Sequence, residues 1–234
     1  MSRTKKAVII GSVLVGIGVI IGFIGIAIGG FKVPNGAVDL TTMKALHAEK
    51  KTVQIADAFD KIEIAGASSM DVEICKSKTG KNYVEYYDTD DWTSHVDVKD
   101  HVLKFTTEDK GKHKAVVSLG FGKDTAARLY LADAEYKEIA VTTLSGYVTI
   151  QDVNAGTVNV SASSGDIDLE RCDAEKFDIT TSSGDVDMEI TAERTYRFET
   201  KTNSGDVDVP DGDADSGYLC KIVTSSGDVE VKQK

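Results

Sequence analysis

The segment "TTSSGDVDM", residues 180–188, decides the fold because variants of it return along the chain. The other copies are "VTTLSGYVTI" (141–150), "VSASSGDIDL" (160–169), "TKTNSGDVDV" (200–209) and "VTSSGDVEV" (223–231). Their central glycines are Gly146, Gly165, Gly184, Gly205 and Gly227, which are 19, 19, 21 and 22 residues apart. A period near twenty residues indicates supersecondary units that stack on one another.

Apolar residues recur at four fixed positions around each glycine. Seven and five residues before it stand pairs such as Phe177 and Ile179, and two and four residues after it stand pairs such as Val186 and Met188. Polar residues alternate with them, and this period of two predicts two half-buried strands per repeat. Such a strand pair cannot bury its apolar face alone, so the repeats should stack in register around a shared core.

We therefore expect an all-β fold, a right-handed single-stranded β-solenoid with about five rungs of about twenty residues. Glycine permits positive φ at each corner, and the flanking Ser, Asn and Asp side chains can hydrogen-bond their own turn. The domain should cover 59–234, with regular repeats over 139–231 and an irregular β-rich capping half over 59–138. Within that half, "SSMDVEI" (68–74) resembles a degenerate repeat with Met70 at the glycine position.

An uncharged apolar stretch lies near the N-terminus, at residues 7–31. As a helix it would reach about 37 Å, enough to cross a bilayer. Arg3, Lys5 and Lys6 precede it, so the positive-inside rule predicts a cytoplasmic tail (1–6), a single-pass anchor in the cell membrane and an extracytoplasmic domain. A cleaved signal peptide is the competing interpretation. Residues 32–58 would then form a juxtamembrane linker.

The part of the chain beyond residue 31 is strongly acidic. Three of the 27 basic residues precede the apolar stretch, which leaves 24 against 38 acidic residues and a formal charge of −14. This charge excludes nucleic acid as a partner and favours a cationic ligand.

Two acidic series follow the glycines. The first comprises Asp166, Asp185, Asp206 and Asp228, and the second Asp168, Asp187, Asp208 and Glu230. Stacked repeats would make each series a row; we expect the first to bond turn amides and the second to form a solvent-exposed negative stripe. Calcium binding is an alternative because carboxylates suit this ion, although the G-G-x-G-x-D signature of calcium-binding β-rolls is missing.

Aromatic residues gather in "NYVEYYDTDDW" (82–92), which contains Tyr83, Tyr86, Tyr87 and Trp92. Exposed beside acidic residues, they could hold a sugar ring or a cationic peptide. Packing in the core or support of a hairpin is the alternative.

No residues form a recognisable catalytic or cofactor motif. The sequence lacks a G-x-S-x-G elbow, a P-loop and an H-E-x-x-H pair. The three cysteines, Cys75, Cys172 and Cys220, lack metal-ligand spacing and fit small core positions. A carbohydrate-active solenoid enzyme remains open, since hydrolases use paired carboxylates, but the acidic rows repeat one group and lack a differentiated pair.

The corners S-G-D-[IV]-[DE]-[LMV] resemble those of the bacterial putative-adhesin family of the DUF4097 type, over about 59–231; only the Gly146 corner departs, with Tyr147 in place of Asp. The resemblance implies a β-solenoid, often with an N-terminal membrane span, and attachment at the envelope of a Gram-positive bacterium. It implies no catalytic residues and no cofactor. We therefore expect a non-enzymatic surface module that binds or senses an envelope protein, a glycan or a cationic peptide.

Overall fold

The computed structural model describes residues 37–39, 44–45, 48–66, 70–89, 92–110, 116–118, 126–132, 135–191 and 193–234. The predicted tail (1–6) and membrane span (7–31) lie outside these ranges. Within them, every regular element is a strand, and no helix has the length and hydrophobicity needed to cross a bilayer. The prediction of an all-β fold is confirmed.

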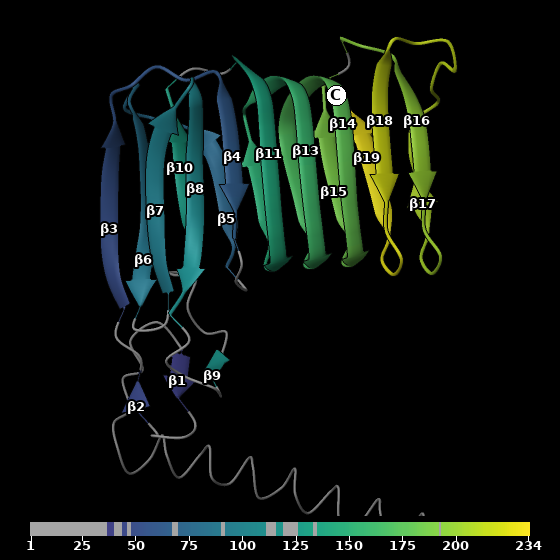
Figure 1. Ribbon diagram of the computed structural model, residues 1–234. Coiled ribbons are helices and arrows are strands. Elements are labelled where there is room, and N and C mark those ends of the chain that lie inside the picture. Colours follow the sequence, from purple (N-terminus) through teal and green to yellow (C-terminus); the bar gives the residue numbers. More distant parts are fainter. Residues whose placement is uncertain are drawn as a thin grey trace, which may run out of the picture.

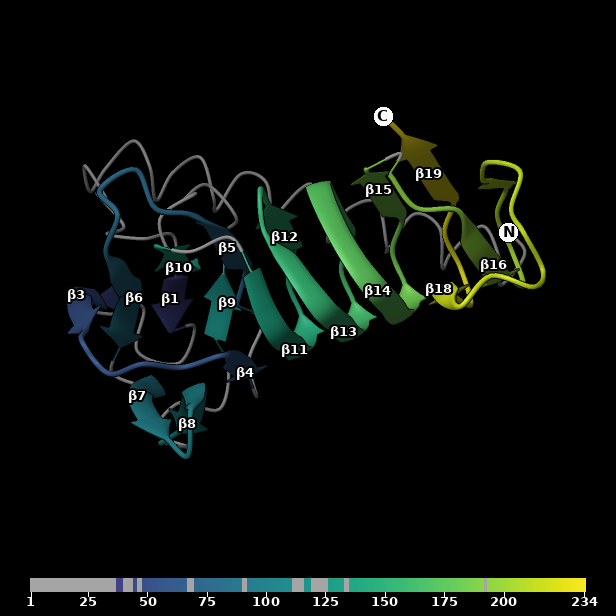
Figure 2. The ribbon, with the colours of Figure 1, turned by 90° about the horizontal axis from the view of Figure 1, so that it is seen from above.

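Two walls of strands face each other and are joined through one long strand, β14 (Ile167–Ser183) (Figures 1 and 2). Sheet 1 contains, in spatial order, β3 (Ala48–Ile55), β6 (Asn82–Thr89), β10 (Ala127–Leu131), β5 (Val72–Lys76), β12 (Val148–Gln151), the first part of β14, β15 (Val186–Ile190), β19 (Val229–Gln233) and β17 (Val207–Asp208). Sheet 2 contains β7 (Trp92–Lys99), β8 (Val102–Asp109), β4 (Lys61–Ala65), β11 (Glu135–Ser145), β13 (Asn154–Ser164), the second part of β14, β18 (Tyr218–Val223) and β16 (Tyr196–Lys201). A separate small sheet has the order β2 (Lys44–Ala45), β1 (Ala37–Asp39), β9 (Val116–Ser118).

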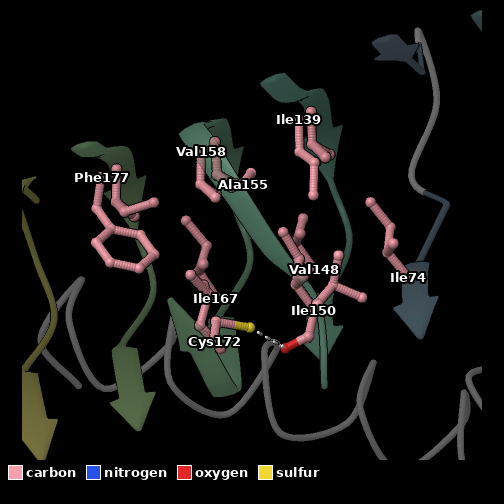
Figure 3. Packing of buried hydrophobic residues seen from close by; sticks show 14 of the residues in the cluster. Ile74, Ile139, Val148, Ile150, Ala155, Val158, Ile167, Cys172 and Phe177 are labelled. Carbon is pink, nitrogen blue, oxygen red and sulfur yellow. Dashed lines mark hydrogen bonds between the residues drawn. The ribbon is translucent and has the colours of Figure 1, made fainter. Parts of the chain in front are cut away.

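The regular half is solenoid-like, as predicted. Each repeat contributes one strand to each sheet, and equivalent residues pair in parallel across repeats, as Val141 pairs with Val160 and Val160 with Ile179. The chain turns from sheet 2 to sheet 1 at the glycine corner. The predicted apolar positions point between the sheets, where Ile139, Val158 and Phe177 are fully buried (Figure 3).

The order of the repeats differs from the sequence order at one end. We number the repeats 1 to 5 by their glycines, from Gly146 to Gly227. In sheet 2, β18 of repeat 5 lies between β14 and β16, and in sheet 1, β19 lies between β15 and β17. Repeat 5 is therefore inserted between repeats 3 and 4 (Figure 1). The expectation that successive repeats stack in sequence order is wrong for the last two.

The N-terminal end of β16 is held by a polar cluster around Tyr196. This tyrosine is fully buried, and its hydroxyl lies 2.7 Å from the Ala174 carbonyl oxygen and 3.0 Å from Asp173 Oδ1. Arg194 Nε donates to Asp173 at 2.8 Å, and its guanidinium lies 4.6 Å from the centre of the Tyr218 ring. These contacts fix the start of β16 one strand further out than the sequence order would place it.

A loop protects the outer edge of β16. The Asp213 N–H donates to the Tyr196 carbonyl at 3.0 Å, so part of the unpaired strand edge is satisfied. An open edge would invite pairing with other chains, and a covering loop reduces that risk.

The irregular half mixes antiparallel and parallel strand pairs, and β4 with β8 and β5 with β10 are parallel. β3 pairs antiparallel with β6, β6 with β10 and β7 with β8, whereas β4 and β5 pair in parallel with β11 and β12 of repeat 1. β3 begins at Ala48, so the folded part extends into the stretch that the sequence assigns to the linker 32–58.

Candidate interaction surfaces

The glycine corners stack along one edge of the domain and leave no room for a side chain. A Cβ atom on Gly184 would lie 2.2 Å from the Gly165 carbonyl oxygen, and one on Gly227 would lie 2.1 Å from that of Gly184. Gly165, Gly184, Gly205 and Gly227 also have φ of 144° to 147°, which side chains disfavour. Both constraints require glycine at these four corners.

The first corner obeys only one of these constraints. Gly146 is not among the residues with positive φ, which corrects the expectation for this position. Its Cβ would still lie 2.3 Å from the Met70 carbonyl oxygen. Met70 therefore occupies the place of a preceding corner, as the degenerate repeat at 68–74 predicts.

The first acidic series forms a ladder of hydrogen bonds between repeats. In each step a carboxylate Oδ1 accepts the backbone N–H of the aligned residue in the next repeat, which stabilises the ladder through a charged acceptor. The steps, acceptor first, are Asp71 to Tyr147 (2.9 Å), Asp166 to Asp185 (2.9 Å), Asp185 to Asp228 (2.8 Å) and Asp228 to Asp206 (2.8 Å). The sequence predicts bonds within each turn; these bonds instead run between neighbouring repeats and link the stack along its axis.

The second acidic series forms a row on the outer face of sheet 1. Asp168 pairs in register with Asp187, Asp187 with Glu230, and Glu230 with Asp208, so the spatial order follows the exchange of repeats 4 and 5. A shallow groove of about 340 Å³ is lined by Asp168, Asp187 and Glu230 together with Glu170, Met188, Glu189, Lys232 and Lys234. We call this surface the acidic face.

Partial burial, together with neighbouring carboxylates, changes the acidity of two residues in this row. Partial burial, followed by the nearby charge of Glu170, raises the pKa of Asp168. Partial burial, followed by the charge of Glu230, likewise raises the pKa of Asp187. The row thus holds negative charge at an energetic cost.

Lysines offset part of this charge. Lys232 Nζ lies 2.6 Å from Glu230, and Lys234 Nζ lies 2.6 Å from Glu189, in both cases at an exposed position. Among the described residues, no group of three or more His, Cys, Asp or Glu side chains is arranged to hold a metal ion. The acidic face can attract cations through its field, but the side chains are not grouped as a calcium coordination shell.

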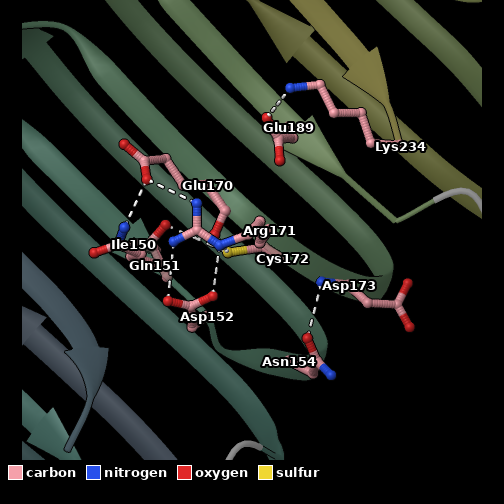
Figure 4. A network of polar contacts seen from close by, with 10 residues as sticks. All are labelled: Ile150, Gln151, Asp152, Asn154, Glu170, Arg171, Cys172, Asp173, Glu189 and Lys234. Atoms are coloured by element: carbon pink, nitrogen blue, oxygen red, sulfur yellow. Dashed lines mark hydrogen bonds and ion pairs between the residues drawn. The ribbon is translucent and has the colours of Figure 1, made fainter. Parts of the chain in front are cut away.

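The opposite corner, where the chain passes from sheet 1 back to sheet 2, carries a different polar network (Figure 4). Arg171 binds Asp152 of the preceding turn through Nε at 2.7 Å and Nη2 at 3.0 Å, and it also contacts Glu170 at 3.2 Å. Asn154 Oδ1 accepts the Asp173 N–H at 3.1 Å. These groups satisfy one another, so the network supports the stack and offers little to a ligand.

The outer face of sheet 2 carries a band of short uncharged side chains beside the glycine corners. Thr142 pairs in register with Ser161, Ser161 with Thr180, and Thr180 with Val223. Two residues closer to the corner lie Leu144, Ser163, Ser182 and Ser225, and all of these except half-buried Val223 are exposed. We call these eight residues the hydroxyl band. The sequence did not predict the hydroxyl band, because Ser and Thr residues alone indicate no catalytic or binding motif. The available signal was their recurrence four and two residues before the glycines.

The predicted aromatic cluster is divided among different environments. Tyr86 is buried and packs edge-on against Phe105 in the core, with ring centroids 5.6 Å apart. Tyr83 is half-buried and stacks on Tyr130, with centroids 4.4 Å apart. Tyr87 is half-buried further along β6, and half-buried Trp92 begins β7 in the other sheet. The structure does not bring the four residues together as one exposed patch.

The cysteines match the prediction of core positions in two of three cases. Cys172 and Cys220 are buried, and burial raises the pKa of each thiol to about 12, so both remain protonated and unreactive at neutral pH. Cys75 is half-buried on β5, and all three are free thiols.

Comparison with known proteins identifies the fold and the family. Among solved structures, the chain is similar to a putative cell adhesion protein from Clostridium sporogenes, with 18% identity, a TM-score of 0.56 and coverage of 81% of this chain and 100% of that one. A putative adhesin from Bacteroides fragilis matches with 16% identity, a TM-score of 0.39 and coverage of 80% and 97%. No curated protein sequence matches significantly. Residues 59–234 match the Toastrack DUF4097 family model, and the chain therefore belongs to the DUF4097 family.

Proposed function

We propose that the protein is a non-enzymatic binding or sensing module, anchored in the bacterial cell membrane by residues 7–31 and displayed outside the cell. Its five repeats would form a five-rung, single-stranded β-helix that holds the ligand-binding faces away from the membrane. Membership of the DUF4097 family and the likeness in fold to a putative cell adhesion protein support this proposal.

The observation that carries the proposal is the uniformity of the two outer faces. On the acidic face acidic side chains recur in register over repeats 2, 3, 5 and 4, and on the other face Thr142, Ser161 and Thr180 recur in register over repeats 1 to 3. Acid–base catalysis needs two groups whose pKa values are driven apart. Here the pKa values of Asp168 and Asp187 are both raised, by the same cause. Repetition of this kind extends a contact surface and does not differentiate a reaction centre.

Display outside the cell is tested by protease accessibility of the full-length protein. In intact cells the domain should be digested, whereas a cytoplasmic control protein should survive. Digestion only after lysis would contradict the proposed orientation.

A carbohydrate-active enzyme is the second candidate, because the groove on the acidic face contains neighbouring carboxylates with raised pKa values. Incubation of the full-length protein with a panel of polysaccharides and peptidoglycan separates the two functions. We expect no turnover. Release of reducing ends that is lost in Asp187→Asn would establish the enzyme instead.

A further inference from the structure

Repeat 1 departs from the other repeats at its corner. It reads Leu144-Ser145-Gly146-Tyr147 where repeats 2, 3 and 5 read Ser-Ser-Gly-Asp. Leu144 is 53% exposed and Tyr147 is 60% exposed, the two highest values among the exposed large hydrophobic residues of the described chain. Two such residues at one corner form an apolar anchor of the kind found at binding sites.

The departure weakens the stack at this point. In the aspartate ladder, the residue after each glycine offers a carboxylate to the next repeat, as Asp166 does to the Asp185 N–H at 2.9 Å. Tyr147 has no carboxylate to offer to the Asp166 N–H, so the ladder is interrupted between repeats 1 and 2. A local rule that is broken without a structural gain points to a functional position.

The outer face of sheet 2 next to this corner carries uncharged side chains. Leu144 belongs to the hydroxyl band, whose rows continue over repeats 2, 3 and 5. The charged residues in the adjoining rows of sheet 2 are paired with one another, as Asp178 is with Lys176 at 3.2 Å and Lys221 at 3.5 Å. The eight residues of the band therefore present hydroxyl groups and apolar contacts, and the row through Val223 ends at the exposed Lys201 of repeat 4.

We propose that the Leu144–Tyr147 corner and the hydroxyl band together bind a neutral glycan chain, an assignment that rests on the proposed binding function and names its ligand class. Tyrosine can pack against the apolar face of a sugar ring, while serine and threonine hydroxyls both donate to and accept from sugar hydroxyls. Rows of hydroxyls spaced about 4.8 Å apart suit a ligand that itself repeats along its length.

Charge distinguishes this ligand from the alternatives. An anionic polymer or lipid headgroup would meet the exposed ladder carboxylates Asp185 and Asp228 on the same edge. A cationic peptide or glycan would instead be drawn to the acidic face, on the other sheet. A neutral chain can contact the hydroxyl band without being repelled by the ladder carboxylates and without being drawn to the acidic face.

The test restores the common corner with the double substitution Leu144→Ser and Tyr147→Asp in the full-length protein. The probes are neutral hexasaccharides of N-acetylglucosamine, glucose and mannose, and a cationic hexasaccharide of glucosamine, measured by calorimetry. We expect at least one neutral probe to bind, with affinity lowered about tenfold or more in the double variant. We expect the melting temperature of this variant to equal or exceed that of the wild type, because the introduced carboxylate can complete the ladder.

Asp187→Asn, on the acidic face, is the matched control and should bind the neutral probe as the wild type does. Binding of no neutral probe, or binding unaffected by the double substitution, would overturn the assignment. Binding of the cationic probe alone, lost in Asp187→Asn, would move the ligand site to the acidic face and leave the proposed binding function intact. Failure of the protease test on intact cells would instead contradict the proposed function itself.

Discussion

The regular half and the irregular half of this domain share one core but are built by different rules. Over repeats 1 to 5 all neighbouring strands pair in parallel, and each corner touches the next through backbone atoms. In the irregular half, antiparallel pairs such as β7 with β8 stand beside parallel pairs such as β4 with β8. The difference shows that an alternating apolar pattern alone does not set the topology, since both halves alternate apolar and polar residues.

The largest expected effect contrasts a glycine from each half. Gly184→Ala places a Cβ 2.2 Å from backbone that cannot move, at φ 144°, whereas Cβ on Gly80 meets nothing within 4 Å, at φ 66°. We expect Gly184→Ala to lower the free energy of unfolding by about 4 kcal/mol or more, and Gly80→Ala to lower it by about 1 kcal/mol. Urea denaturation of both variants measures the difference. Equal losses would show that the stacked corners are not the constraint we infer.

The second prediction tests the exchanged order of repeats 4 and 5. Val207 and Val229 occupy the same position after their glycines, yet Val229 is 1% exposed and Val207 is 42% exposed. Val229→Ala should therefore cost about 2 kcal/mol of unfolding free energy, and Val207→Ala less than about 0.5 kcal/mol. If the repeats stacked in sequence order, Val207 would be interior and the two losses would be reversed.

The sequence is sufficient to predict which side chains form the core but not the order of the repeats. Ile139, Val158 and Phe177 follow directly from their spacing to the glycines, because a period of two allows only one inward set. The corners of repeats 3, 4 and 5 have the same local chemistry, so any one can stack on another. The last two separations, of 21 and 22 residues, exceed the earlier 19 and give the chain the extra length that the exchanged order requires. Thr200 of repeat 4 is polar, so repeat 4 is better placed at the end of the stack than in its interior.

The candidate surfaces divide in the same way. The acidic row was predictable because its residues alternate with core residues and are acidic in repeats 2 to 5. The hydroxyl band was not, because a row of Ser and Thr becomes a surface only when the neighbouring strands are in place. The aromatic cluster is divided because Tyr87 lies on β6 in sheet 1, whereas Trp92 begins β7 in sheet 2.

The aspartate ladder gives a prediction in which the two halves should agree. Asp185 accepts the Asp228 N–H, and Asp71, in the irregular half, accepts the Tyr147 N–H in the same way. Replacing either with alanine removes one charge-assisted hydrogen bond and should lower the unfolding free energy by about 1 kcal/mol. Asparagine keeps the Oδ1 acceptor, so Asp185→Asn and Asp71→Asn should cost much less. A loss at Asp185 alone would confine the ladder to the regular half.

The smallest effect concerns the acidic row, where the two halves should respond with opposite signs. Asp187 pairs in register with Glu230, another acid, whereas Glu73 in the same row is bound by Arg128, with Nε to Oε2 at 2.8 Å and Nη2 to Oε1 at 3.2 Å. At pH 7 we expect Asp187→Asn to raise the melting temperature slightly, because it removes a charge that partial burial and the nearby Glu230 disfavour. We expect Glu73→Gln to lower it, because it removes the Glu73 carboxylate from Arg128. Each change should be below about 1 kcal/mol, as is usual for exposed charges.

The pH dependence of Asp187→Asn identifies the cause. Because the pKa of Asp187 is raised by folding, the folded protein takes up this proton more readily than the unfolded chain. The carboxyl therefore destabilises the fold only when it is ionised, and its penalty disappears as the pH falls to about 4 and below. Thermal melting of the wild type and the variant between pH 7 and pH 3 should show the gain from asparagine shrinking to zero. A gain that persists at pH 3 would mean that packing, and not the cost of the ionised carboxylate, produces it.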